Sequence, residues 1–387
     1  MNLLVTAMSS AARPSRICNF AYDLVRCAAS SKEEIRVTLA IGKWQELYFR
    51  RQFKLDDTRT TIVPVDIPNN PFARSLWHLH ELPRLAENIA ADVIHLASPV
   101  PVRRSVLRRP IVVSLHDLKP CDASDNFGFP DDFFNRVFFH RCLMEVDCVT
   151  CATEASRNAL KTRFPRIAQR KGVVVGDCPA IQCDEARRPE CDTGQFILMI
   201  AQHRAAKDIP LMLEVFGNLL REKQIDKGTF LVLVIDQGPE AVEVKFDLKR
   251  RALETTVRLI GEVSDGELRW LYENCEALII PSLVEGRGLT LVEGLLCGSR
   301  VVCSDIPVFR EIGGKTCHYF DLHAESRSSA LAAAICCALA EPARSMEKRG
   351  RFSIEKIAQE YATLYSRLIK VNPNGVAGEK EIGCATA

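Results

Sequence analysis

Short apolar runs alternate along most of the chain with longer segments of helical periodicity. The runs at 196–200 and 230–235 are continuously apolar, which is typical of parallel strands that helices cover on both faces. The alternation therefore predicts an α/β fold built on parallel sheets. A segment with prolines and charges but no periodicity, 178–193, divides the pattern into two halves.

Two such halves in a chain of 387 residues predict two Rossmann-like domains, whose sheets we expect to face each other across a cleft. We assign residues 1–183 to an N-terminal domain and residues 193–353 to a C-terminal, ligand-binding domain. The helical segment 354–371 is expected to pack back towards the N-terminal domain, and 372–387 to form a loose tail. Because open parallel sheets bind ligands beyond the carboxyl ends of their strands, we expect the site in the cleft.

The composition narrows the class of protein. A hydrophobic content of 47% and a charged content of 26% are those of a globular chain, and a net charge of +2 argues against a dedicated nucleic-acid binder. Most of the 16 cysteines lie in apolar runs, which favours reduced packing residues in a cytoplasmic protein. Cys148 and Cys151 have metal-ligand spacing, but no second pair accompanies them, so we expect no metal site.

One segment carries most of the chemical information. A strand ends at Pro281, a glycine-rich turn follows, and a helix starts near Leu289, so backbone N–H groups at the helix start can bind an anion. Glu285 and Glu293 bracket this turn, and eight positions on a helix are a little over two turns. A carboxylate repels phosphate but suits hydroxyl groups. The combination fits a ligand with a central phosphate and hydroxyls at both ends, as in a nucleotide sugar.

This segment resembles the Glu-x7-Glu signature of glycosyltransferase family 4, which are retaining transferases of the GT-B fold. The resemblance continues in order through 257–272, 297–307 and 309–314. It implies a GT-B architecture and transfer of a sugar from a nucleotide diphosphate sugar. The alternative is a strand-turn-helix with two solvated glutamates and no ligand.

The resemblance implies roles for residues of this segment. Glu293 would bind the ribose of the donor, and Glu285 would be catalytic beside the donor sugar and its phosphate. Other donor-binding residues would be Arg287 and, through backbone amides, Gly288, Leu289 and Thr290. The family usually has an aromatic residue where Arg287 stands, which leaves the contacts with the sugar open.

Three further catalytic residues are implied elsewhere. Arg204 and Lys207 match the family's cationic segment that grips the diphosphate, where fixed positive charge stabilises the leaving group. His116 matches a histidine that approaches the donor sugar. The structural alternatives are a solvated basic loop for the first two and a strand-end hydrogen bond for the histidine.

Acceptor-side residues are less specific. The loop 9–16 departs from the family's Gly-Gly, although its small residues permit close backbone approach, and Arg13 or Arg16 would meet a phosphate. Asn126 lies in an aromatic segment that suits an acceptor loop or, alternatively, a packed aromatic loop.

These features predict a retaining hexosyltransferase that acts without a metal, since no Asp-x-Asp occurs, and without a cofactor beyond its nucleotide sugar substrate. Its partners would be a nucleotide sugar donor and a saccharide or lipid-linked acceptor in bacterial polysaccharide or glycolipid assembly, with no nucleic acid. Alternatives are a nucleotide-sugar epimerase, a glycoside phosphorylase, or an inactive transferase-like binding subunit. Basic residues at 103–109 and 161–171 suit contact with the inner face of the plasma membrane, or simply a solvated surface.

Overall fold

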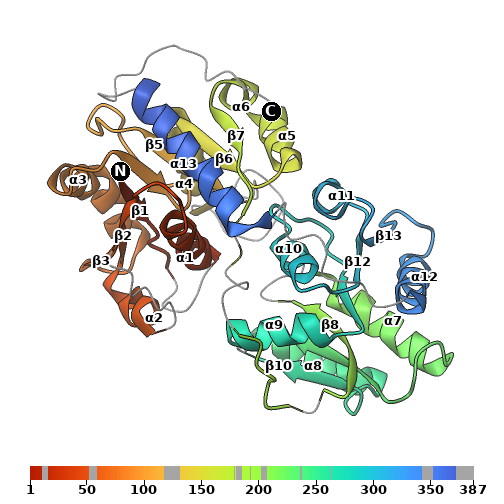
Figure 1. The fold of residues 1–387 in the computed structure, drawn as a ribbon. Coiled ribbons are helices and arrows are strands. Elements are labelled where there is room, and N and C mark those ends of the chain that lie inside the picture. The colour runs from red at the N-terminus through yellow and green to blue at the C-terminus, as the bar shows by residue number, and fades with distance from the viewer. Residues whose placement is uncertain are drawn as a thin grey trace. The chain divides into compact units, whose positions relative to one another are not determined.

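We describe the protein from a computed structural model, in which the described residues are 1–10, 16–51, 59–116, 131–177, 179, 185–191, 193–201, 207–235, 238–261, 263–341 and 352–371. The chain forms two compact units, one of Met1–Cys178 with Phe352–Ala387 and the other of Pro179–Arg351 (Figure 1). The tail predicted over 372–387 lies outside the described residues. Each unit carries a parallel sheet with helices on both faces, so the predicted α/β class is confirmed.

The N-terminal unit is built on a seven-stranded parallel sheet in the order β3-β2-β1-β4-β5-β6-β7. Its strands are β1 (Asn2–Thr6), β2 (Arg36–Gly42), β3 (Thr60–Val65), β4 (Val93–Leu96), β5 (Ile111–Leu115), β6 (Cys148–Cys151) and β7 (Gly172–Val174). Its helices are α1 (Arg16–Ala29), α2 (Glu46–Arg51), α3 (Pro71–Asn88), α4 (Asp131–Glu145), α5 (Glu154–Arg163), α6 (Pro165–Lys171) and α13 (Ile354–Val371), with a 3-10 turn at Lys43–Gln45.

Two groups of helices bury this sheet. One core joins strand residues to α3 and α4 and includes Leu4, Ile94, Val113, Trp77 and Leu143. On the opposite face, α13 packs beside α1, and its Tyr365 hydroxyl contacts His95 of β4 at 2.6 Å. Helix α13 therefore completes the N-terminal unit.

The C-terminal unit contains a six-stranded parallel sheet in the order β10-β9-β8-β11-β12-β13. Its strands are β8 (Gln195–Ile200), β9 (Thr229–Val234), β10 (Val257–Ile260), β11 (Ala277–Ile280), β12 (Val301–Ser304) and β13 (His318–Phe320). Its helices are α7 (Ile209–Arg221), α8 (Pro239–Arg251), α9 (Asp265–Asn274), α10 (Leu289–Leu296), α11 (Pro307–Gly313) and α12 (Arg327–Ala340).

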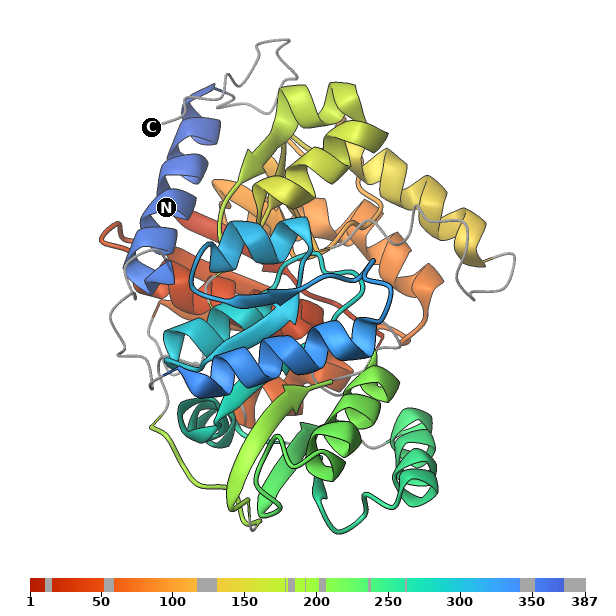
Figure 2. The same ribbon diagram turned by 90° about the vertical axis from the view of Figure 1, so that its right-hand side faces the viewer.

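The strand order of this unit decides where a ligand can bind. The direction of strand addition reverses between β8 and β11, so their carboxyl ends flank a topological switch point. Helices α7 and α12 lie side by side on one face of the sheet (Figures 1 and 2). On the other face α10 lies so close that a Cβ at Gly294 would be only 2.3 Å from Leu278 Cδ2. This close contact fixes α10 relative to the strand that precedes it.

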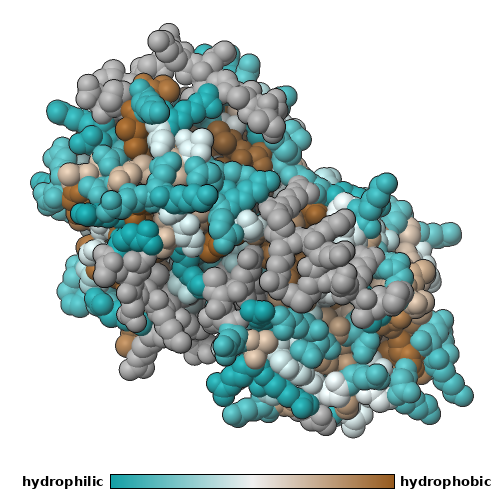
Figure 3. Space-filling model, in the orientation of Figure 1, coloured by the Kyte–Doolittle hydropathy of each residue, from teal (hydrophilic) through white to brown (hydrophobic). Residues whose placement is uncertain are grey.

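The face shown in Figure 3 is largely hydrophilic, with smaller apolar areas. Within the described part of the chain, no helix combines the length and the hydrophobicity that crossing a bilayer requires.

Candidate functional site

Two loops that start at the switch point bring together charged residues distant in sequence. The loop after β8 carries Lys207 and the turn after β11 carries Glu285. Lys207 Nζ donates to Glu285 Oε2 at 2.9 Å, and the two side chains are only 9% and 12% exposed. A buried ion pair adds little net stability, so its position at two strand ends favours a ligand site. Arg204, predicted to act with Lys207, lies outside the described residues.

The neighbouring residue anchors Lys207. Asp208 has a left-handed backbone (φ +48), an uncommon conformation for a non-glycine residue. Its carboxylate accepts a hydrogen bond from Arg327 Nη1 of α12 at 2.7 Å. This bond holds the end of the loop on a regular helix and limits the positions that Lys207 can reach.

The glycine-rich turn ends in a helix N-terminus. Gly288 is left-handed (φ +66) and precedes α10, whose first residues are Leu289 and Thr290. Amides at a helix start have no intrahelical carbonyl to bind, and the helix dipole makes this end positive. A Cβ at position 288 would lie 2.4 Å from Ile312 Cδ1. Glycine therefore allows both the backbone conformation and the approach of α11.

Glu293 lies in the second half of α10 and is held by Tyr272 of α9. The Tyr272 hydroxyl donates to Glu293 Oε2 at 2.8 Å. Burial raises the pKa of Glu293 to about 7, although the Tyr272 hydroxyl and the charges of Arg287 and Lys207 act to lower it. Such a carboxyl can change its ionisation near neutral pH, which is typical of functional sites.

Arg287 is well buried for an arginine, with 8% of its surface exposed. It lies in the turn between Glu285 and Gly288, and its charge acts on Glu293. The family that the sequence resembles usually has an aromatic side chain at this position. The chain instead has a cation in this turn, and a cation there favours an anion beside the helix N-terminus.

The N-terminal unit holds His116 at the end of β5. Its Nε2 lies 2.6 Å from the carbonyl oxygen of Ala97, and its ring meets the edge of Phe20, with centroids 4.8 Å apart. The histidine is therefore oriented by contacts from the residue that follows β4 and from α1. The side chains of Arg13, Arg16 and Asn126 lie outside the described residues.

Two buried side chains, those of Tyr272 and His95, had no role predicted from the sequence. Tyr272 lies within the range 257–272 that carries the resemblance, but no function was predicted for it. Its contact with Glu293 joins two helices across 21 residues of chain, which a local sequence pattern does not show. His95 stands inside an apolar strand and contacts Ser114 and Tyr365 at 2.8 and 2.6 Å. A histidine in the centre of an apolar run is the sequence signal that could have found it.

The cysteine pair with metal-ligand spacing lies inside a strand. Cys148 and Cys151 are buried in β6, and burial raises the pKa of Cys151 to about 12. Both have free thiols. Over the described ranges, no three or more His, Cys, Asp and Glu side chains gather in a way that could hold a metal ion.

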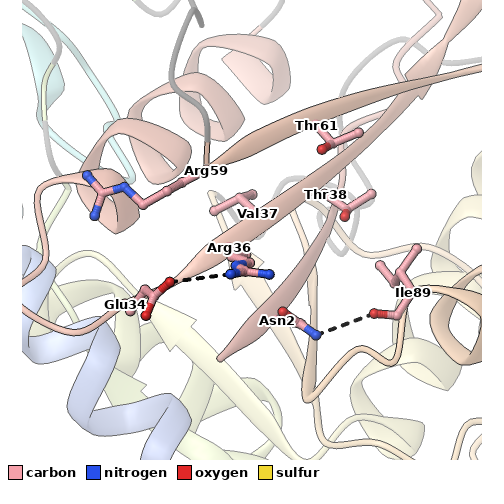
Figure 4. Close-up of a pocket in the computed structure, with 8 residues that line it drawn as sticks. All are labelled: Asn2, Glu34, Arg36, Val37, Thr38, Arg59, Thr61 and Ile89. Carbon is pink, nitrogen blue, oxygen red and sulfur yellow. Dashed lines mark hydrogen bonds and ion pairs between the residues drawn. The ribbon is translucent and has the colours of Figure 1, made fainter.

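A pocket of about 570 Å³ lies elsewhere in the N-terminal unit (Figure 4). Residues at or near the amino ends of β1, β2 and β3 and neighbouring loops line it: Asn2, Glu34, Arg36, Val37, Thr38, Arg59, Thr61 and Ile89. Since the strands are parallel, their amino ends lie together at one end of the sheet, whereas His116 follows the carboxyl end of a strand at the opposite end. The pocket is therefore separate from His116.

Two family models match successive parts of the chain. The model described as "Glycosyl transferases group 1" matches residues 184–356, and that described as "Glycosyltransferase Family 4" matches residues 19–176. The first range contains Lys207, Glu285 and Glu293, and the second contains His116. The resemblance found in the sequence is thereby confirmed at the level of the family.

Curated relatives are similar over part of their length. O-antigen chain mannosyltransferase RfbU of Salmonella typhimurium is 23% identical over 212 residues, which are 53% of this chain and 55% of RfbU. The chain thus spans about half of the length of that relative.

Solved structures are similar over almost the whole fold. Sucrose-phosphate synthase from Thermosynechococcus elongatus has a TM-score of 0.69 at 16% identity, covering 96% of this chain and 99% of its own. HepE from Anabaena, solved in complex with UDP-glucose, has a TM-score of 0.63 at 15% identity, covering 97% and 98%. These similarities support the fold.

Proposed function

Because the chain belongs to the GT-B glycosyltransferases of the family 4 type, we propose that it transfers a hexose from a nucleotide diphosphate sugar to an acceptor with retention of configuration. The observation that carries this proposal is the buried ion pair of Lys207 and Glu285. Lys207 follows strand β8 at the switch point, and Glu285 lies in the turn that leads to the N-terminus of α10. A cation and free helix amides suit a diphosphate, and carboxylates suit hydroxyl groups on either side of it.

We assign the donor to the C-terminal unit. Lys207, together with Arg204, grips the diphosphate and stabilises the charge that grows as the glycosidic bond breaks. Glu293 binds the ribose, and Glu285 faces the donor sugar. The leaving phosphate then takes part in deprotonating the acceptor, and His116 of the N-terminal unit approaches the donor sugar.

The names of the relatives suggest the product. RfbU is named an O-antigen chain mannosyltransferase. We therefore propose mannose as the first sugar to test and a bacterial surface polysaccharide, built on a saccharide or lipid-linked acceptor, as the product.

The function can be tested with the purified chain, nucleotide sugars that differ in base and sugar, and lipid-linked saccharides extracted from bacterial membranes. We expect one labelled sugar to enter the saccharide, and NMR of the product to show the donor's anomeric configuration. Conversion of the donor without acceptor would indicate an epimerase, and release of a sugar phosphate a phosphorylase. Donor binding without any product would indicate a binding subunit.

Activity should survive an excess of chelator. We expect the diphosphate to be neutralised by Lys207, Arg204 and the amides of α10, because the sequence lacks the Asp-x-Asp with which many transferases hold a metal. The transfer rate with and without EDTA, after dialysis against it, provides the measurement. A loss of rate that magnesium or manganese restores would show that a metal takes part.

We also propose that the N-terminal unit contacts an anionic membrane surface through α4, α5 and α6. Helix α4 exposes three apolar side chains, Val137, Phe138 and Met144. The Lys171 Nζ bond to the Met144 carbonyl, at 2.7 Å, brings the end of α6 alongside α4. The exposed cations of this surface are Arg141, Lys161, Arg163, Arg166 and Arg170. Among the described side chains of 137–171, Glu154 is the one exposed acid, so the surface complements anionic headgroups.

Reversing three of these charges should release the protein from membranes. In the triple variant Lys161→Glu, Arg166→Glu, Arg170→Glu, loss of about 1 kcal/mol per cation predicts a fall of more than about a hundredfold in partition onto phosphatidylglycerol vesicles. Co-sedimentation measures it. A matched control is Lys245→Glu on α8, which also exposes Phe246 but carries acids beside its cations. Equal binding of the triple variant, or equal binding to neutral vesicles, would contradict the proposal.

A further inference from the structure

The partly buried carboxyl of Glu293 has a partner that is itself fixed. Tyr272 is fully buried and donates its hydroxyl hydrogen to Glu293 Oε2 at 2.8 Å. Its backbone carbonyl accepts from Ser299 Oγ at 2.6 Å, so the segment after α10 holds the end of α9. At its other end, α9 starts with a reciprocal capping box between Ser264 and Glu267. The hydroxyl therefore has little freedom to turn to another acceptor.

The charges around Glu293 come from three other segments. Asp265 of α9 raises the pKa of Glu293, while Arg287 of the turn and Lys207 of the loop after β8 lower it. Burial has the largest effect and brings this pKa to about 7. The thiol of Cys297, which follows α10, has a pKa raised to about 12 by burial and is neutral. Burial also raises the pKa of Tyr272 well above its usual value, so its hydroxyl remains a donor.

We propose that Tyr272 is a positioning residue that makes donor affinity depend on pH, by holding Oε2 of Glu293 and leaving Oε1 to accept from the ribose hydroxyls of the nucleotide sugar. This role presupposes the proposed function. A carboxyl is a full acceptor only when it is ionised. The donor therefore binds the ionised form, and binding releases a proton wherever Glu293 is protonated in the free protein.

The sign of the pH dependence follows from this linkage. Below about pH 7, Glu293 is increasingly protonated, and the affinity should fall by up to tenfold for each pH unit. Above about pH 7 the affinity should be level. A nucleotide sugar is the appropriate probe because its diphosphate is esterified at both ends and has no proton to release in this range. UDP-glucose and GDP-mannose cover two bases and two sugars.

Tyr272→Phe should move the midpoint of this profile upwards. It deletes one hydrogen bond to the ionised carboxylate, which is expected to raise the midpoint by roughly one pH unit and to weaken donor binding at pH 7 by up to about tenfold. At pH 9 the affinity should return close to that of the wild type. Isothermal titration calorimetry at several pH values, in buffers of different ionisation enthalpy, gives both the affinity and the number of protons released.

Two variants serve as controls. Glu293→Gln cannot ionise, so its donor affinity should be lower and independent of pH, with no proton release. Tyr365→Phe deletes another fully buried tyrosine hydroxyl, the one that contacts His95, and should keep the wild-type profile. If Tyr272→Phe lowers the affinity equally at every pH, the tyrosine is only structural. If Glu293→Gln keeps the wild-type midpoint, another group titrates; either result overturns the proposal.

A measurement without donor separates this inference from the proposed function. Carbon-13 NMR of the ligand-free protein, labelled in glutamate, can follow the Glu293 carboxyl, assigned by its absence in Glu293→Gln. We expect a midpoint near 7 in the wild type and a higher one in Tyr272→Phe. If this shift occurs but calorimetry detects no binding of a nucleotide sugar, the result contradicts the proposed function and with it the donor role of Tyr272. Donor binding with an unchanged carboxyl midpoint would overturn only the role of Tyr272.

Discussion

Replacing Lys207 by alanine should lower kcat by about a hundredfold or more, and by a larger factor than it raises the KM for the donor. The diphosphate is anionic in the ground state, so the ammonium contributes to capture. Its contribution grows as charge gathers on the departing oxygen, and only that increment raises turnover. The same result is expected of Arg204→Ala. Steady-state kinetics with a nucleotide sugar, after circular dichroism has verified the fold, provides the measurement.

The ion pair makes the choice of controls important. Lys207→Ala leaves Glu285 buried without its cation, and breaking a buried pair in this way typically destabilises a protein by about 3–5 kcal/mol. The double variant Lys207→Ala, Glu285→Gln removes both charges and should recover most of the stability but not the turnover. Lys245→Ala on the exterior of α8 should change neither. If Lys207→Ala alters only KM, the lysine captures the donor and does not act on the chemical step.

The fold was predictable where strands are continuously apolar. The runs 196–200 and 230–235 became β8 and β9, because buried parallel strands have no polar face. Strand β3 has no such run: it is an edge strand with two threonines and Pro64, and its pairing with β2 rather than its composition makes it a strand. Tertiary pairing of this kind is not visible in a local pattern.

The candidate site was predictable to the extent that it is local in sequence. Glu285, Gly288 and Glu293 belong to one strand-turn-helix, whose glycine and carboxylate spacing indicate an anion site. The bond from Lys207 to Glu285 spans 78 residues, and only the switch point between β8 and β11 explains it. The ionisation of Glu293 is still harder to predict from the sequence, because it depends on burial and on Tyr272 of another helix.

Gly288→Val should destabilise the C-terminal unit by roughly 2–4 kcal/mol and weaken donor binding at least tenfold. The left-handed backbone at φ +66 costs about 1–2 kcal/mol for a residue with a Cβ, and more for a β-branched one. A Cβ would also lie 2.4 Å from Ile312 Cδ1 and 3.3 Å from Val308 Cγ1, and overpacking typically costs about 1–3 kcal/mol. Both effects displace the first amides of α10, which we expect to bind the diphosphate. Thermal unfolding and calorimetry with a nucleotide sugar measure the two losses.

A double-mutant cycle with Ile312→Val separates strain from crowding. This substitution removes the methyl group that the new Cβ would meet, and by itself should cost about 0.5–1.5 kcal/mol. If crowding against α11 contributes, Gly288→Val should cost about 1 kcal/mol less in the Ile312→Val background. Donor affinity should recover only in part, because the left-handed conformation remains strained and continues to misplace the helix start. Equal cost in both backgrounds would assign the effect to the backbone alone, whereas unchanged stability of Gly288→Val would show that neither the conformation nor the approach of α11 requires glycine.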